Sequence, residues 1–89
     1  MITLVYSKKY LTARKKFVRH NLVRARNLNS TLKFFVDNPT HPSLRTEKLR
    51  GTDVWTIRID EKNGIFFIWW NRETAVLIDV GPHDKYRKY

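Results

Sequence analysis

The chain contains no cysteine among its 89 residues. Disulfide bridges, thiolate metal sites and cysteine nucleophiles are therefore excluded, and folding has to depend on the packing of an apolar core. Acidic residues are also scarce, since 8 Asp and Glu stand against 18 Lys and Arg and leave a formal net charge of +10. A positive field of this kind attracts polyanions, so nucleic acid, the ribosome or an acidic protein is the expected partner. The plainer alternative is a solvated helix surface that repulsion keeps soluble.

Long hydrophobic runs are missing as well. No apolar stretch approaches the roughly 20 residues that a membrane span requires. The first residues, "MITLVYSKKY", have no charged residue before the apolar stretch and no small-residue cleavage site after it, which is unlike a signal peptide. We therefore expect a soluble, cytoplasmic protein without a membrane partner, and at this length a single domain over residues 1 to 89.

Glycine and proline are few, and neither occurs between Ser7 and Asp37. Apolar residues recur there every three or four positions with basic residues between them, which is the pattern of amphipathic helices. One helix of about thirty residues is too long for so small a domain, so we expect a break near residues 19 to 21 and an antiparallel helix pair. Ser7 is the expected cap of the first helix, and the second should end before Pro39.

Strand patterns occupy the rest of the chain. Residues 2 to 6 are rich in β-branched side chains, and residues 55 to 60 alternate between apolar and polar. Residues 65 to 70 and 75 to 80 are two further apolar strands, and Asn63-Gly64 is a favoured dipeptide for the hairpin turn before them. The sequence thus predicts an α+β domain of order β-α-α-β-β-β, in which two helices cover one face of an antiparallel meander. The other face is expected to be free for a ligand.

Two features of the predicted sheet point to binding. Alternation places Arg58 on the free face, where it is a candidate phosphate ligand. Its alternative role is an ordinary cross-strand partner of an acid, for which the candidates are Asp60, Glu61 and Asp79. The adjacent Trp69 and Trp70 must face opposite sides of their strand, so we expect one in the core and the other as an interface anchor.

Three stretches carry a resemblance to a known family: "NPTHPSLRTEKLRG" at residues 38 to 51, the tryptophan-containing strand after it, and Gly-x-His at residues 81 to 83. Together they resemble the RelE/ParE superfamily of toxins from bacterial toxin–antitoxin systems, and among them the RelE/YafQ-like mRNA interferases. The resemblance covers nearly the whole chain. It implies a cognate antitoxin, and ribosome-dependent cleavage of mRNA in the A site without a metal or other cofactor. The same fold also serves ParE-like gyrase inhibitors, which is the alternative function.

The chemistry that this resemblance implies is attack of a ribose 2′-hydroxyl on the adjacent phosphate. His83 falls where the YafQ-like branch has its catalytic histidine and is the candidate general acid or base, the plainer alternative being a surface histidine after a turn. Arg58 corresponds to a basic strand position of the RelE branch and would stabilise the phosphorane. Tyr86 is the third catalytic candidate, because an aromatic residue after the terminal histidine can stack on a base; Tyr89 competes for that role.

The other candidates are RNA contacts in the loop and in the C-terminal residues. The loop histidine His41 matches one of the YafQ-like branch, with a helix cap as its alternative. Lys48 and Arg50 either add to the positive field or belong to a loop that braces the sheet. The C-terminal residues have the composition of an RNA contact, unless they fray as chain ends do. The RNA-binding candidates are His41, Arg45, Lys48, Arg50, Lys85, Arg87 and Tyr89.

One departure from the family concerns the middle strand. The family commonly has Tyr-Arg or a similar pair at its start, whereas this chain has "NGIFFIWW" with Ile65 or Phe66 at that point. Lys62 in the turn and Arg45 in the loop are the possible substitutes for the missing arginine. The departure keeps open a catalytically attenuated toxin that only binds antitoxin or RNA.

Overall fold

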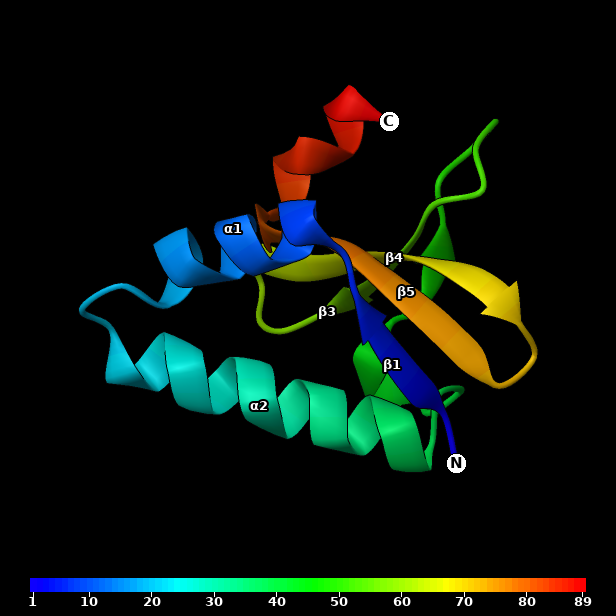
Figure 1. Cartoon of the computed structure of the whole chain (residues 1–89), viewed down its shortest axis with the longest axis horizontal. Helices are drawn as coiled ribbons and strands as arrows, with labels where there is room; N and C mark the ends of the chain where they lie inside the picture. Colours follow the sequence, from blue (N-terminus) through cyan, green and yellow to red (C-terminus); the bar gives the residue numbers. More distant parts are fainter.

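The computed structural model describes residues 1–89, and its strands form one five-stranded sheet (Figure 1). The strand order is β1-β5-β4-β3-β2, with β1 parallel to β5 and every other neighbour antiparallel. In chain order the elements are β1 (Thr3–Tyr6), α1 (Lys8–Val18), α2 (Leu22–Asp37), the 3-10 turn η1 (Pro42–Leu44), β2 (Glu47–Lys48), β3 (Trp55–Arg58), β4 (Asn63–Asn71), β5 (Thr74–Pro82) and the 3-10 helix η2 (His83–Lys88).

The α+β architecture expected from the sequence is confirmed, including the two N-terminal helices and the meander. The structure adds the two-residue strand β2 at one edge of the sheet. It also places β1 at the opposite edge, next to the last strand. The sheet is therefore mixed. Neither long helix combines the length and the apolar character that crossing a membrane would require.

Side-chain caps set the helix boundaries. The Ser7 hydroxyl accepts a hydrogen bond from the Tyr10 backbone N–H at 3.0 Å and begins α1. The Asn21 side chain accepts from the Arg24 N–H at 3.0 Å and begins α2. Between them His20 has a φ of 54°, in the left-handed region that ends a helix. The predicted break near residues 19 to 21 is confirmed.

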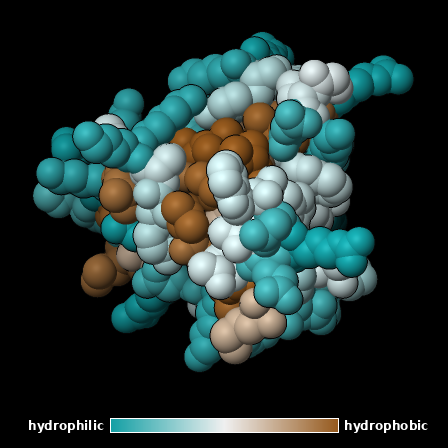
Figure 2. All heavy atoms as spheres, turned by 45° about the vertical axis from the view of Figure 1, so that its right-hand side comes forward, coloured by the Kyte–Doolittle hydropathy of each residue, from teal (hydrophilic) through white to brown (hydrophobic).

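One core lies between the helices and one face of the sheet. It joins residues from α1 and α2 to those of β3, β4 and β5; its fully buried members include Tyr10, Phe35, Ile57, Ile65, Phe67, Ala75 and Leu77. Trp69 packs against this core, whereas Trp70 is 75% exposed at a bulge of β4. The two rings thus face opposite sides, as expected. On the molecular surface, hydrophobic residues show in a central area and in smaller areas toward the edge, with hydrophilic side chains between and around them (Figure 2).

The predicted turn at Asn63-Gly64 is wrong, because both residues belong to the start of β4. The chain reverses one step earlier. There the Asp60 carboxylate accepts from the backbone N–H groups of Lys62 and Asn63, each at 2.8 Å, which is a side-chain-stabilised turn. Gly64 is required for a different reason: a Cβ at this position would lie 3.0 Å from the Ile57 carbonyl oxygen of β3.

The face of the sheet away from the helices is not free along its whole length, which corrects the sequence-based expectation. Thr56, Phe66 and Asp79 form one row across it, and all three are buried. The C-terminal residues, 83 to 89 and called the tail below, cover this row. The Tyr89 ring lies 5.5 Å from the Phe66 ring, between centroids.

A buried carboxylate attaches the tail to the sheet. Asp79 is 1% exposed, and one of its oxygens, Oδ1, accepts a hydrogen bond from Lys85 Nζ at 2.9 Å. Its other oxygen, Oδ2, accepts from the Tyr89 hydroxyl at 2.7 Å. Lys9 of α1 completes the group, with its Nζ 2.7 Å from the Tyr89 hydroxyl and 3.9 Å from Oδ2. The tail is therefore fixed to the sheet and to α1 through one buried carboxylate.

The pKa of Asp79 reflects this environment. Burial raises the pKa of the carboxyl, but the hydrogen bonds from Lys85, Tyr89 and the Val80 N–H, with the charge of Lys85, outweigh burial and hold the pKa below its usual 3.8. A carboxyl whose folded-state pKa is lowered stabilises the fold above the unfolded-state pKa. That stabilisation is lost as the pH falls through the folded-state value.

Replacing Asp79 with Asn should therefore lower the free energy of unfolding by about 2 kcal/mol at neutral pH, because two lysines lose their carboxylate partner. In a chain of this size the loss lowers Tm by roughly 10 °C. The difference from the unchanged protein should shrink well below pH 3.8, where that carboxyl is protonated too. Thermal unfolding followed by circular dichroism at both pH values measures it. Asp84→Asn, an exposed tail carboxyl outside both ion pairs, is the matched control, and an equal effect there would contradict the assignment.

Candidate functional site

The turn between β3 and β4 brings the two main sequence candidates to the same end of the sheet. Arg58 is the last residue of β3, and its Nη1 lies 3.4 Å from the Glu61 carbonyl oxygen. His83 is the first residue after β5, and its backbone N–H donates to the Lys62 carbonyl at 2.6 Å. Both residues thus contact the backbone of one four-residue turn, residues 59 to 62.

The imidazole of His83 lies over the sheet row that contains Arg58. Its Nδ1 would be 3.9 Å from a Cβ placed on Gly64, and Gly64 is the register partner of both Arg58 and Gly81. Nδ1 is buried and has no hydrogen-bond partner in the protein. Proton exchange with a ligand therefore falls to the other ring nitrogen, Nε2.

A hollow of about 200 Å³ next to the turn contains Arg58 and Arg45 together. Neither guanidinium takes part in an ion pair, because both ion pairs of the chain are made by Asp79. Arg58 therefore has none of the three acidic partners that the sequence offered as an alternative. Asp60 and Glu61 line the same hollow, so a phosphate that accepts hydrogen bonds from both guanidinium groups would also lie near two carboxylates.

Arg45 reaches this hollow through an unusual backbone conformation. It ends η1 with φ 46° and ψ 48°, in the left-handed region that an arginine seldom adopts. Of the two substitutes that the sequence suggested for the missing strand arginine, Arg45 is the one that lines the hollow with Arg58. Ile65 and Phe66, which stand at the place of that arginine, are both fully buried.

The two tyrosines of the tail have different environments. Tyr86 is 42% exposed, and its ring centroid lies 5.9 Å from that of His83. The Arg87 guanidinium lies 5.9 Å from the same ring. Tyr89 instead has its hydroxyl on Asp79 and its ring against Phe66. Tyr86 is thus the tyrosine with an accessible ring next to the histidine.

Several of the proposed RNA contacts lie elsewhere or are already engaged. The Lys85 ammonium is bonded to Asp79. His41 Nδ1 accepts from the Ser43 N–H at 3.1 Å, which caps the following turn η1 rather than the preceding helix, and its ring lies 4.6 Å from that of Phe34. Lys48 pairs with Trp55 in register, which puts it on the helix side of the edge strand. Arg50 is exposed beyond that strand.

Sequence reasoning missed the residues that hold this site in shape. From the sequence, Asp79 is a candidate only as a partner of Arg58, and Lys9 is only one of the basic residues in the N-terminal half. Gly81 has a φ of 152°, and a Cβ on it would lie 2.8 Å from Lys85 Cε. The glycine of the Gly-x-His motif was the available signal. The reason for a glycine at this position is that the Lys85 side chain packs against it, and only the three-dimensional structure shows this contact.

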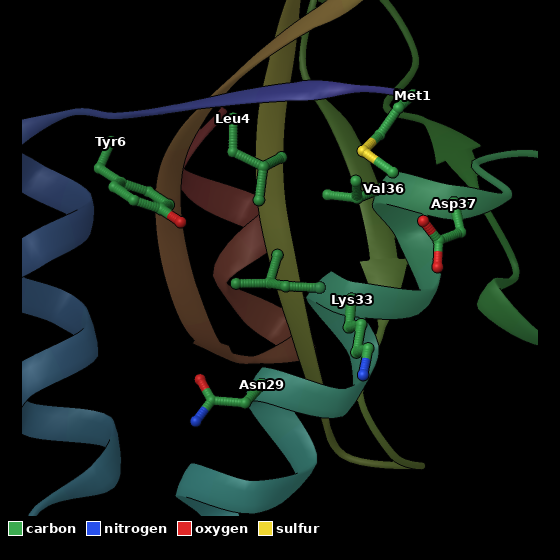
Figure 3. Close-up of a pocket in the computed structure, with 8 residues that line it drawn as sticks. Met1, Leu4, Tyr6, Asn29, Lys33, Val36 and Asp37 are labelled. Carbon is green, nitrogen blue, oxygen red and sulfur yellow. The ribbon is translucent and has the colours of Figure 1, made fainter.

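Other features of the surface contain none of the predicted site residues. The largest hollow, about 550 Å³, lies between β1 and α2, where Leu4 and Tyr6 face Asn29, Lys33 and Val36 (Figure 3). Its lining is mostly hydrophobic, and one acid, Asp37, lies at its end. No group of three or more His, Asp or Glu side chains is arranged as a metal ion would require.

Comparison with known proteins identifies the fold. No protein-family model and no curated protein sequence matches the chain. Solved structures do match it over almost its full length. A metal-bound toxin from Helicobacter pylori has 20% sequence identity and a TM-score of 0.76, covering 96% of this chain and 98% of the toxin. The E. coli DinJ–YafQ toxin–antitoxin complex has 13% identity and a TM-score of 0.74, with 94% of both chains covered.

A third solved structure, the YoeB/ParE toxin from Agrobacterium tumefaciens, has 16% identity and a TM-score of 0.71, and covers 92% of this chain and 99% of the toxin. At identities this low, the likeness establishes the fold and leaves activity to be argued from the site. The chain thus has the fold of the RelE/ParE-type toxins that its sequence resembles.

Replacing Gly81 with Ala should loosen the tail, because the new Cβ occupies the path of Lys85 and the φ of 152° disfavours a side chain. We expect faster hydrogen exchange at the backbone amides of residues 83 to 89, measured by mass spectrometry. Gly51→Ala is the control. Gly51 also has a positive φ, of 75°, but no atom lies within 4 Å of its added Cβ. Unchanged exchange in the Gly81→Ala tail would contradict the packing described.

Proposed function

We propose that this protein is the toxin of a toxin–antitoxin pair, and that it is a ribosome-dependent endoribonuclease that cleaves mRNA in the A site. The observation that carries the proposal is the arrangement around residues 59 to 62. Arg58 and Arg45 line a hollow beside this turn with Asp60 and Glu61 but form no ion pair, and the imidazole of His83, whose backbone contacts the same turn, lies over the neighbouring strand. The fold shared with YafQ and YoeB/ParE toxins supports it.

The proposed reaction requires only groups that such a site contains. The ribose 2′-oxygen attacks the adjacent phosphorus, forming the bond to the 2′-oxygen and breaking the bond to the 5′-oxygen of the next nucleotide. The products are a cyclic phosphate and a free 5′-hydroxyl. One proton leaves the 2′-hydroxyl and one reaches the departing oxygen; Nε2 of His83 serves one of these two transfers, and a solvent water serves the other. Arg58 and Arg45 stabilise the negative charge that develops on the phosphoryl oxygens.

Tyr86 has a supporting role in this proposal. Its accessible ring lies beside His83, so a base stacked on it keeps the reacting phosphate within reach of the imidazole. Such stacking contributes roughly 1 to 3 kcal/mol per base. The exposed Arg87 adds positive charge next to the ring.

The proposed partners follow from charge and from the neighbours. The formal charge of +10 suits both the ribosomal RNA surface and an acidic antitoxin segment. Structural neighbours include DinJ–YafQ and YoeB–YefM complexes. We therefore propose a cognate antitoxin as the inhibitor of this protein.

A gyrase inhibitor is the second candidate function, because the neighbours include a YoeB/ParE toxin. The third is a toxin that binds antitoxin or RNA without cutting, favoured by the buried Ile65 and Phe66 where an arginine is usual. Brief induction followed by primer extension separates the three. Translation-dependent cuts within reading frames support the nuclease, intact mRNA with a DNA-damage response supports the gyrase inhibitor, and normal growth supports the attenuated toxin.

Changing His83 to Asn should abolish growth arrest and lower mRNA cleavage by about a hundredfold or more, because the proton transfer loses its carrier. The matched control is His20→Asn. It makes the same change at an exposed histidine between the helices, where φ is 54° and asparagine is well tolerated. Growth after induction and primer extension measure the effect. A fully toxic His83→Asn protein with unchanged Tm would contradict the assignment of His83 as the catalytic histidine.

Changing Arg58 to Gln should reduce the cleavage rate constant by about 10²- to 10³-fold with a smaller change in KM, because the guanidinium acts mainly on charge that develops during reaction. Arg45→Gln should have the same sign and a smaller size, since one guanidinium remains. Single-turnover cleavage on programmed ribosomes measures both. Arg50→Gln, an exposed arginine outside the hollow, is the control. Equal losses in all three variants would indicate diffuse charge rather than a phosphate site.

A further inference from the structure

A second basic hollow lies where α1, the start of α2 and the end of β5 meet. Its volume is about 360 Å³, and three of the residues that line it are cations: Lys16, Arg24 and Lys85. No acid lines it. We call it the α1–β5 hollow. None of the sequence candidates for RNA binding except Lys85 belongs to it.

Two of the three cations have no carboxylate partner. Lys85 is neutralised by Asp79, whereas Lys16 and Arg24 are in neither ion pair of the chain. Both are exposed at the rim of the hollow. The cations in the lining of the hollow therefore exceed the carboxylates that pair with them, although the charge of Arg24 also acts on nearby Asp60, and an anionic group of matching size would be attracted there.

The position of Arg24 is fixed by its contacts with α1. Its guanidinium carbon lies 4.9 Å from the Phe17 ring centroid, and its Nη1 lies 3.4 Å from the Phe17 carbonyl oxygen. One face of the planar guanidinium is thus against an aromatic ring. Since Arg24 is exposed, its other face is available to a flat ligand, and nucleic-acid bases stack on arginine in this way.

The hollow adjoins the proposed catalytic site along the backbone of β4 and β5. Asn63, Gly81 and Pro82 line it, and the next residues along the chain, Gly64 and His83, form the histidine side of the site. Two residues of chain span at most about 7 Å. A strand of RNA whose phosphodiester lies at His83 can therefore place its adjoining nucleotide in the hollow.

We propose that the α1–β5 hollow binds the nucleotide next to the cleaved phosphodiester, with its phosphate between Lys16 and Arg24 and its base on the Arg24 guanidinium. This inference rests on the proposed function for the identity of the strand. Two observations favour RNA over an acidic protein segment: the planar, pre-positioned cation and the shared backbone with His83. A carboxylate-rich peptide would need only positive charge in the hollow, and a planar cation would give it no advantage.

The test measures binding without cleavage. A short fluorescent oligoribonucleotide with a 2′-O-methyl group on every sugar has no 2′-hydroxyl that could attack and cannot be cut, and fluorescence anisotropy over a range of salt concentrations gives its affinity. Lys16→Gln should weaken binding roughly fivefold and lower the salt slope by about 0.7, the value for one phosphate contact with a single strand. Lys15→Gln is the matched control, because Lys15 is exposed on the same helix, one residue away, and does not line the hollow.

The Arg24 arm tests the stacking. Arg24→Lys keeps the charge and loses the plane, so it should weaken binding while leaving the salt slope unchanged. Equal losses in Lys15→Gln and Lys16→Gln would overturn the proposal, as would the absence of measurable binding by the unchanged protein. The same Lys16 dependence for a polyglutamate peptide, without one for RNA, would assign the hollow to an acidic protein partner and overturn it too.

This experiment is independent of catalysis. If the unchanged protein binds as expected but cuts no mRNA on ribosomes, RNA binding in the α1–β5 hollow is supported and the nuclease proposal fails. If mRNA is cut, and Lys16→Gln binds and cuts no differently from Lys15→Gln, the nuclease proposal is supported and RNA binding in the hollow is overturned.

Discussion

The buried carboxylate of Asp79 is the group on which the arrangement of this molecule depends. Taking a charge out of water is costly unless hydrogen bonds and an opposite charge compensate it, and here the compensation comes from two distant parts of the chain. Lys85 and Tyr89 bring the tail to the sheet, and Lys9 brings α1 to the tail. The same contacts fix the position of the tail, which contains His83 and Tyr86, and limit its movement.

The charge of the protein is divided by this arrangement. The ammonium groups of Lys9 and Lys85 pair with Asp79, whereas the guanidinium groups of Arg45, Arg58 and Arg24 are in no ion pair. Arginine suits such positions because its charge persists at any physiological pH and its planar donors match phosphate oxygens.

Much of the fold follows from local rules that a sequence displays. The helix break follows from Asn21 as a cap, and the two faces of β3 follow from strict alternation. The turn predicted at Asn63-Gly64 is wrong because the same dipeptide suits both a turn and a close backbone approach. The turn forms earlier in the chain, where the Asp60 carboxylate caps it. Contacts between chain segments carry no local signal: Lys9 and Tyr89 are 80 residues apart. For the same reason the sequence named the types of residue in the site but not which tyrosine or which second arginine would be near.

The conformation of Arg45 has a consequence for how this protein could change. Left-handed backbone costs an arginine about 1 kcal/mol, and glycine would adopt it freely. Selection for thermal stability alone would thus favour Gly at residue 45. The resulting protein would be more stable and would have one cation fewer beside Arg58. At this residue, robustness and affinity for anions pull in opposite directions.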